Sequence, residues 1–322
     1  MKHISRRRFL QSGGLTAAAM VGMTGWVSRA AGADSQRKFT MDLVCGAIGV
    51  RADQREAIRL AHVHGFESVG PSPQFLAELS AGQMDELLAD LRTKNLVWGA
   101  AGLPVNFRRD EDAFRADLAK LPGLAEGLQR AGVTRVGTWI APNHADLTYV
   151  RNFRQHATRL RKIAKILSDC ELRFGLEYVG PKTSWTAARH PFIHTMAETK
   201  DLLAEIGQAN VGFVLDSWHW YTAGETVEEL RTLTNQEVVA CDLNDAPEGI
   251  PVDQQRDNRR ELPAATGVID LAGFLNALVE IGYDGPIRAE PFNQQLNAME
   301  DEAAVETTAA AMRKAFALIG TG

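Results

Sequence analysis

The 322-residue sequence lacks several features that would assign it directly to a class. Its three cysteines, Cys45, Cys170 and Cys241, form no CxxC pair, which argues against a disulfide framework and a thiolate zinc site. No GxxxxGKS/T motif occurs and no GxGxxG follows the first predicted strand, so the fingerprints of nucleotide-binding folds are missing. The 28 glycines and 12 prolines are too few for a collagen-like chain, and 45% hydrophobic residues argue against disorder. These absences leave a globular protein with a large core.

Basic charge is also scarce. The chain has 35 Lys and Arg residues against 40 Asp and Glu residues, for a net charge of -5. Five of the basic residues and none of the acidic ones fall within the first 33 residues, so the remainder is more acidic than the total indicates. An acidic surface repels phosphodiester backbones and gains little from counterion release. Nucleic acid is therefore not an expected partner.

The first 33 residues have the composition of an export signal. The run Ser-Arg-Arg-Arg-Phe-Leu at residues 5–10 is followed by a short, Gly-rich apolar stretch and by Ala-Gly-Ala at residues 31–33, which suits signal-peptidase cleavage. The paired arginines look like the twin-arginine signal of bacteria. The alternatives are a membrane anchor, for which about 20 apolar residues are needed, or a chance basic tail. We expect a signal peptide at residues 1–33, a periplasmic or otherwise exported protein with no stable membrane span after processing, and one domain at residues 34–322.

Short apolar runs of the β type alternate with segments whose apolar residues recur at helical spacing. The expected strands are Met41–Cys45, Phe66–Val69, Leu96–Ala100, Arg135–Ile140, Leu172–Tyr178, Val211–Leu215, Glu237–Leu243 and Ile287–Glu290. The expected helices include Met84–Leu91, Tyr149–Ser168, Met196–Ile206, Val227–Leu233, Leu271–Ile281 and Ala303–Ile319. Eight strands separated by helices, mostly without hairpin signals, indicate parallel pairing through right-handed crossovers. The count favours a single closed (β/α)8 TIM barrel over an open doubly wound sheet.

Four successive predicted strands each deliver a carboxylate after an apolar run: Glu177, Asp216, Asp242 and Glu290. In a TIM barrel the functional groups lie where the strands end, at the C-terminal face. One such carboxylate alone is explained by a helix N-cap or a solvated loop, but four at equivalent positions point to a shared site. Two carboxylates about 4 Å apart repel by roughly 4 kcal/mol at an effective dielectric constant near 20. Shared protons relieve this repulsion less well than a hard divalent cation such as Mg²⁺, Mn²⁺ or Ca²⁺.

The segments around these carboxylates carry a family resemblance. They are Gly-Leu-Glu177-Tyr-Val-Gly-Pro, Val-Leu-Asp216-Ser-Trp-His219, Asp242-Leu-Asn-Asp245-Ala-Pro and Gly-Tyr-Asp-Gly-Pro-Ile-Arg-Ala-Glu290-Pro-Phe. In this order they resemble the sugar isomerase/epimerase family with the xylose isomerase-like TIM barrel, over nearly all of the mature chain. The resemblance implies that Glu177, Asp216, Asp242 and Glu290 bind one divalent metal ion, Mn²⁺ or Mg²⁺. It also implies that Glu177 and Glu290 act as acid and base.

The seventh strand departs from this family, which usually has His where this sequence has Asp242. An Asp can still bind a metal ion, but it adds negative charge and makes the ligand set harder in the hard–soft sense of metal coordination. Asp245, three residues later, is the alternative ligand if the strand is displaced.

The resemblance further implies a set of substrate contacts. His219 matches a family position that hydrogen-bonds a substrate oxygen next to the reacting carbon, with a buried structural His as the alternative. Arg260 begins an Arg-Glu-Leu-Pro segment similar to the family's R-x-L-P-G-x-G loop and would grip a substrate oxygen, with a surface salt bridge as the alternative. His144 is expected at the pocket rim, and Trp185 is expected to stack on sugar C–H surfaces or to pack in the core.

Together these residues predict proton transfer next to a carbonyl. A metal ion bound to a carbonyl oxygen and a neighbouring hydroxyl acidifies the intervening C–H and stabilises the enediolate, while one carboxylate removes the proton and another returns it. We therefore predict a metal-dependent isomerase or epimerase that acts on a keto-sugar or related carbohydrate. The alternatives are a 3-keto-glycoside lyase or hydrolase with the same enolate chemistry, and a non-catalytic periplasmic sugar-binding protein. The sugar, its phosphorylation and homo-oligomer formation stay open.

Overall fold

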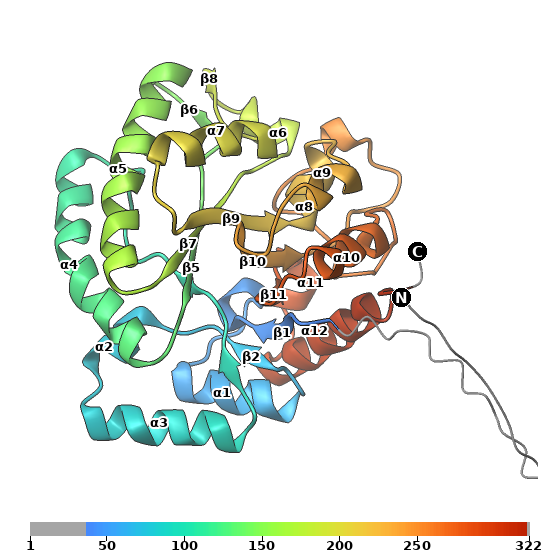
Figure 1. The fold of residues 1–322 in the computed structure, drawn as a ribbon. Helices are drawn as coiled ribbons and strands as arrows, with labels where there is room; N and C mark the ends of the chain where they lie inside the picture. Colours follow the sequence, from blue (N-terminus) through green and yellow to red (C-terminus); the bar gives the residue numbers. More distant parts are fainter. Residues whose placement is uncertain (1–36, 321–322) are drawn as a thin grey trace, which may run out of the picture. The chain divides into compact units, whose positions relative to one another are not determined.

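The computed structural model describes residues 37–320, so the predicted signal peptide at residues 1–33 lies outside the described part. Nine short strands form one sheet of parallel neighbours in the order β3-β2-β1-β11-β10-β9-β7-β5-β4. The two end strands, β3 (Val97–Trp98) and β4 (Ala101–Gly102), belong to one stretch of chain that is interrupted only at Gly99 and Ala100. The sheet therefore closes into a barrel with eight strand positions, which we call staves, with β3 and β4 counted as one stave. The predicted TIM barrel is confirmed (Figure 1).

The remaining staves lie at or within a few residues of their predicted positions. They are β1 (Thr40–Leu43), β2 (Ser68–Val69), β5 (Arg135–Trp139), β7 (Arg173–Glu177), β9 (Val211–Asp216), β10 (Val238–Leu243) and β11 (Pro286–Ala289). The longer helices are α1 (Gln54–Val63), α3 (Ala81–Thr93), α4 (Glu111–Arg130), α5 (Tyr149–Asp169), α7 (Met196–Ile206), α10 (Leu271–Glu280) and α12 (Asp301–Phe316), and they lie outside the strands (Figure 1). None of the helices in residues 37–320 is both long and apolar enough to cross a membrane.

The break in the third stave contains a residue that must be glycine. A Cβ atom at Gly99 would lie 2.4 Å from both carboxylate oxygens of Asp42, so the close approach of that side chain requires glycine. Asp42 belongs to β1 and is buried. The missing side chain at Gly99 therefore makes room for a carboxylate inside the barrel.

Helix α4 is one element that the sequence analysis did not anticipate. Pro122, Gly123 and Gly127 interrupt its apolar pattern, although the chain stays helical throughout. Gly127 is needed where α4 meets α2 (Pro73–Glu78), because a Cβ atom there would lie 2.7 Å from the Ala77 Cα atom. The packing of two helices thus outweighs a poor local helix propensity.

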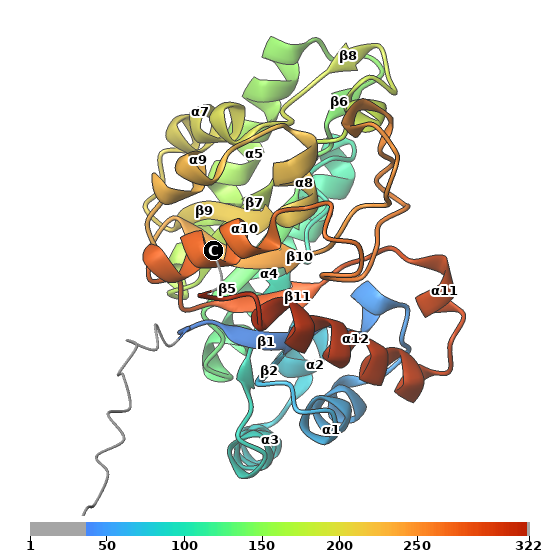
Figure 2. The same ribbon diagram turned by 90° about the vertical axis from the view of Figure 1, so that its right-hand side faces the viewer.

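Short elements cluster where the staves end. Strand β9 leads into α8 (Ser217–Thr222) and then α9 (Val227–Arg231), the connection after β10 contains the 3₁₀ turn η2 (Val252–Gln254), and β11 leads into α11 (Gln294–Asn297). A small antiparallel sheet pairs β6 (Asn143–His144) with β8 (His190–Pro191), and α6 (Lys182–Trp185) precedes β8. Figure 2 shows α8, α11, β6 and β8 toward the same side of the strands, which is the side where the site is formed.

Candidate active site

The four strand-end carboxylates lie together. Glu177 ends β7, Asp216 ends β9, Asp242 is in β10, and Glu290 directly follows β11. One carboxylate oxygen from each of the four lies within 4.8 Å of the others. The first three residues are buried, and the Glu290 side chain is 15% exposed. The parallel register of neighbouring staves brings these residues to one end of the barrel, because equivalent strand positions end at the same edge.

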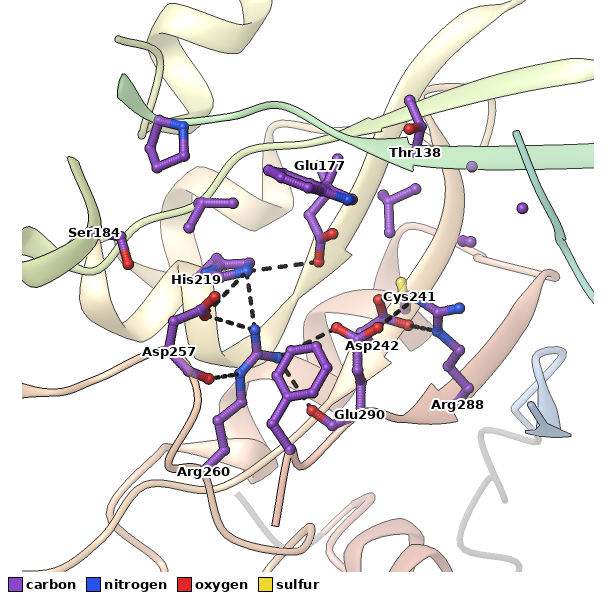
Figure 3. Close-up of a pocket in the computed structure, with 18 of the residues that line it drawn as sticks. Thr138, Glu177, Ser184, His219, Cys241, Asp242, Asp257, Arg260, Arg288 and Glu290 are labelled. Carbon is purple, nitrogen blue, oxygen red and sulfur yellow. Dashed lines mark hydrogen bonds and ion pairs between the residues drawn. The ribbon is translucent and has the colours of Figure 1, made fainter. Parts of the chain in front are cut away.

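Three of these carboxylates, all but Asp216, line a cavity of about 970 Å³. Glu177, Asp242, Glu290, His219 and Arg260 line it, together with small residues of other staves such as Ala100, Gly137 and Ala240. Figure 3 shows Thr138 across the pocket from Arg260 and Glu290. Pockets that bind small ligands commonly have volumes of about 300–1,000 Å³, so this one has room for a monosaccharide and a further substituent.

The close approach of the carboxylates changes their ionisation. Burial, followed by the negative charges of Glu290, Asp242 and Asp216, raises the pKa of Glu177 well above its ordinary value. Burial raises the pKa of Glu290 to about 7, against the stabilising effect of Arg288 on its ionised form. The Glu177 Oε1 atom is buried and has no hydrogen-bond partner among the described residues. The cluster thus contains negative charge that the surrounding protein does not fully compensate.

Arg260 supplies one of the two cations of the cluster. Its Nη1 atom donates to Asp216 Oδ2 at 2.6 Å and lies 3.5 Å from Glu290 Oε2, while Nη2 donates to Asp257 Oδ1 at 2.8 Å. The guanidinium lies between the rings of Trp218 and Phe292, with its Cζ atom 5.6 and 4.6 Å from the two ring centroids. Arg260 is 2% exposed, so it is a buried part of the pocket and not a surface salt bridge. Figure 3 shows it between Asp257 and Glu290.

Arg288 supplies the second cation, and the sequence analysis did not single it out. Its Nε and Nη2 atoms bind the two oxygens of Asp242 at 2.5 and 2.8 Å, and Nη2 also donates to Glu290 Oε1 at 3.0 Å. This fork-to-fork geometry is the strongest form of a carboxylate–guanidinium pair. Asp242, which stands where the family usually has His, therefore has both carboxylate oxygens bound to Arg288 of the neighbouring strand β11.

His219 in α8 lies 3.7 Å from Glu177 Oε1 and 3.6 Å from Asp216 Oδ2, measured from Nε2. Burial lowers its pKa to about 3, so the imidazole is neutral. The Gly180 N–H donates to His219 Nδ1 at 3.2 Å, and Arg260 Nη2, which can only donate, lies 3.3 Å from His219 Nε2. A neutral imidazole accepts at only one ring nitrogen, so the Gly180 and Arg260 contacts favour opposite tautomers. In either tautomer Nε2 faces the carboxylates of Glu177 and Asp216.

Asp245, the alternative ligand of the seventh strand, lies in a different environment. Its carboxylate accepts hydrogen bonds from the backbone N–H groups of Ala246, Thr266, Gly267 and Ile269 at 2.7–3.0 Å. These contacts hold the long connection between β10 and α10 against the strand. The structure thus places Asp242 in the carboxylate cluster and gives Asp245 a role in loop structure.

His144, which the sequence places at the pocket rim, and Trp185, which it expects to stack on the sugar or to pack in the core, do not line the pocket. The Nδ1 atom of His144 accepts from the backbone N–H groups of Asp146 and Leu147, so the ring holds its own loop. The Trp185 ring stacks on His194 with centroids 4.7 Å apart. Their neighbours Asn143 and Ser184 line the pocket instead, because each loop turns the adjacent side chain inward.

Several other pocket residues escaped the sequence analysis, although weak signals existed. Asp42 and Arg288 are charged residues inside otherwise apolar strands, a pattern that often marks a functional or paired group. Asp257 precedes Arg260 by three residues and binds it. Arg108 has no local signal, because it lies in an irregular loop with several other charged residues.

The donor set of the cluster suits a hard divalent cation. Carboxylate oxygens are the ligands that such ions prefer, and the unpartnered Glu177 Oε1 atom is one that a cation would satisfy. The residues able to hold it are Glu177, Asp216, Asp242 and Glu290. Asp242 would have to share its oxygens with Arg288, which distinguishes it from the other three.

Comparisons with known proteins agree with this architecture. Residues 58–315 match the family model of the xylose isomerase-like TIM barrel, and the chain belongs to that family. The inosose isomerase of Bacillus velezensis is 24% identical over 273 residues, covering 81% of this chain and 93% of that protein. This relative indicates an enzyme of the sugar isomerase/epimerase type.

Solved structures support the same fold. A xylose isomerase domain protein from Alicyclobacillus acidocaldarius is 31% identical, with a TM-score of 0.74 over 84% of this chain and 96% of that one. The IolI protein, solved with a bound zinc atom, is 21% identical, with a TM-score of 0.69 over 85% of this chain and 96% of that one. At this identity the second likeness concerns the fold alone.

Proposed function

We propose that this protein is a metal-dependent isomerase or epimerase that moves a proton at a carbon next to the carbonyl of a keto-sugar or related carbohydrate. The observation that carries the proposal is the convergence of four carboxylates from successive staves, with one oxygen of each within 4.8 Å of the others, beside a large pocket that three of them line. The inosose isomerase relative supports the same class of reaction.

The proposal gives each residue a role. Glu177, Asp216, Asp242 and Glu290 would hold one divalent cation, Mn²⁺ or Mg²⁺. When bound, such an ion polarises a carbonyl and makes the neighbouring C–H more acidic. Glu177 and Glu290 lie on opposite sides of the cluster along the barrel rim, on β7 and after β11, and would remove and return the proton.

Two further residues orient the substrate in this proposal. His219 presents Nε2 toward the cluster and, in the tautomer that carries the proton there, would donate to an oxygen next to the reacting carbon. Arg260 holds Asp216 and Asp257 in place and would donate to a second oxygen. The two aromatic rings beside Arg260 exclude water from its guanidinium, which strengthens its hydrogen bonds.

The test is exchange of substrate hydrogen with solvent. The purified whole chain is loaded with Mn²⁺ or Mg²⁺ and incubated in D₂O with keto-hexoses, keto-pentoses and a keto-inositol, and NMR follows deuterium at the carbon next to the carbonyl. We expect deuterium there together with an isomer or epimer of the substrate, and no exchange after chelation. Glu248→Gln, an exposed carboxylate in the long connection after β10, is a matched control for Glu290→Gln.

The products separate the alternatives. Deuterium exchange with loss of a substituent would assign the site to elimination, as in a 3-keto-glycoside lyase. Sugar binding without exchange under any metal condition would replace the enzyme proposal by a sugar-binding protein.

A further inference from the structure

A second feature of the pocket concerns Arg108, which lies in the connection between β4 and α4 and lines the same cavity as the carboxylates. Its guanidinium lies on the ring of Trp139, with its Cζ atom 4.1 Å from the ring centroid, and 4.6 Å from that of Phe107. Nη1 donates to the Trp139 carbonyl at 2.7 Å and to Thr138 Oγ1 at 3.4 Å. These contacts hold the Arg108 side chain in one orientation beside Thr138 and Trp139 of β5, at the wall of the pocket.

The backbone that carries Arg108 is also fixed. Arg159 of α5 is buried, although the helix pattern places it on the charged face, and its Nη1 atom donates to the carbonyls of Phe107 and Arg109 at 2.8 and 2.6 Å. Arg159 thus binds the carbonyls on both sides of Arg108. A binding group held in this way loses little conformational entropy when a ligand arrives.

Arg108 differs from the other pocket arginines in its charge balance. Arg260 and Arg288 each bind at least two carboxylates, but no carboxylate among residues 37–320 pairs with Arg108. Arg256 also lines the cavity, but it is exposed and can be solvated by water. Burial lowers the pKa of Arg108 to about 10, and no neighbouring acid opposes this effect. A half-buried cation without a counter-charge is costly unless something else supplies the charge.

We propose that Arg108, stacked on Trp139, forms a subsite for an anionic substituent of the substrate, a carboxylate or a phosphate. A planar guanidinium with free N–H groups binds both of these groups well. The substituent would lie across the pocket from the carboxylate cluster, since Arg108 contacts Thr138 and Thr138 stands opposite Arg260 and Glu290 (Figure 3). The inference rests on the proposed function for the identity of the substrate as a sugar, but the subsite itself is testable by binding alone.

Small side chains leave the path between the two sites open. Ala100, Ala101, Gly102, Gly137 and Ala240 line the cavity between the staves. In a filled barrel, bulky branched residues occupy such interior positions. A sugar carbon next to a carbonyl can therefore lie at the cluster while a group at the other end of the same molecule reaches Arg108.

The experiment measures binding of three probes that differ only at carbon 6: D-fructose, D-fructuronate and D-fructose 6-phosphate. Calorimetric titration of the Mn²⁺-loaded whole chain should show that at least one anionic probe binds about 10-fold or more tightly than D-fructose. Arg108→Gln should weaken the favoured anionic probe by roughly 10- to 100-fold, since charge-assisted hydrogen bonds are lost, and leave the affinity for D-fructose unchanged. Arg108→Lys should retain part of the preference, and the exposed neighbour Arg109→Gln is the matched control.

The identity of the favoured probe separates the two sources of negative charge, a carboxylate or a phosphate. The proposal is overturned if neither anionic probe binds more tightly than D-fructose, or if Arg108→Gln retains the full preference. A preference that depends on Arg108 together with no deuterium exchange would keep the subsite and refute the proposed reaction. Deuterium exchange without any preference for an anionic probe would support the proposed reaction and refute the subsite.

Discussion

The two halves of the barrel mouth are built from different kinds of side chain. Staves β7, β9, β10 and β11 carry the four carboxylates, and two arginines bind three of them. Staves β4 and β5 carry glycine, threonine and tryptophan, and the loop after β4 adds Arg108, which has no acidic partner in the part of the chain that the structure describes. The first half concentrates negative charge at short range that two arginines compensate only in part, whereas the second provides space and a cation that pairs with no carboxylate of residues 37–320. Chemistry is therefore expected in the first half and recognition of the remaining substrate in the second.

The largest effect should come from removing a carboxylate from the first half. Glu177→Gln and Glu290→Gln keep the size of the side chain and remove its basicity, so each should slow deuterium exchange by roughly 10²- to 10⁴-fold, the usual contribution of general acid–base catalysis. The melting temperature should not fall, because the amide relieves repulsion within the cluster. Unchanged exchange in both variants would remove these residues from the chemistry.

Substitutions of Arg288 and Asp242 test whether the ion pair between them stabilises the folded protein. Arg288→Met leaves a buried carboxylate without its bidentate partner, so the free energy of unfolding should fall by about 3–5 kcal/mol. Adding Asp242→Asn to this variant should restore most of the loss, because no uncompensated charge remains. Urea denaturation of the two single variants and the double variant measures the coupling, and additive effects would show that the pair is not a unit.

Substitution of Asp42 tests how much a buried carboxylate inside the barrel lowers the free energy of unfolding. Burial raises its pKa from 3.8 to about 6 in the folded protein, against the attraction of Arg288 and the hydrogen bond of Ser68. The folded state therefore keeps the proton to a higher pH than the unfolded state does, so stability falls as the pH rises from about 4 to 6. The shift corresponds to about 3 kcal/mol. Asp42→Asn should remove that loss, and equal pH profiles of urea unfolding for the two proteins would contradict it.

The smallest of these effects is expected for His219→Ala. The variant loses one hydrogen-bond donor to substrate but none of the four carboxylates, so turnover should fall by about 10- to 200-fold while most of the bound metal remains. His219→Asn retains a donor and should recover part of the activity. Metal analysis and steady-state kinetics distinguish this outcome from loss of the cation, which would show that the ring has a ligand role after all.

The barrel and the carboxylate cluster were predictable because they depend on repeated local signals. An apolar run that ends in an acid recurs on four staves, and parallel pairing brings such ends to one edge whatever the detailed packing. The eight staves were located by the same reasoning. Helix α4 was missed because its propensity is poor at Pro122 and Gly127, and its packing against α2 compensates for that.

The loop residues around the pocket show what could not be predicted from the sequence, which is the direction in which a loop side chain points. His144 and Asn143 are neighbours in the chain, as are Trp185 and Ser184, and in each case only the second of the pair lines the pocket. The direction of a loop side chain depends on backbone hydrogen bonds such as those that His144 accepts from Asp146 and Leu147. Nothing in the local sequence specifies which of two adjacent residues will make them.

The sequence by itself determined the family, the eight-stave barrel and the four carboxylates, because periodicity and strand ends are local properties of the chain. Only the tertiary structure decided which charges are compensated. Asp242 and Arg288 are 46 residues apart along the chain and bind each other across neighbouring staves. Arg108, by contrast, lies among charged residues in the sequence but pairs with no acidic residue in the described part of the fold, residues 37–320. Charge compensation depends on distances of a few ångströms and on exclusion of water, and folding sets both.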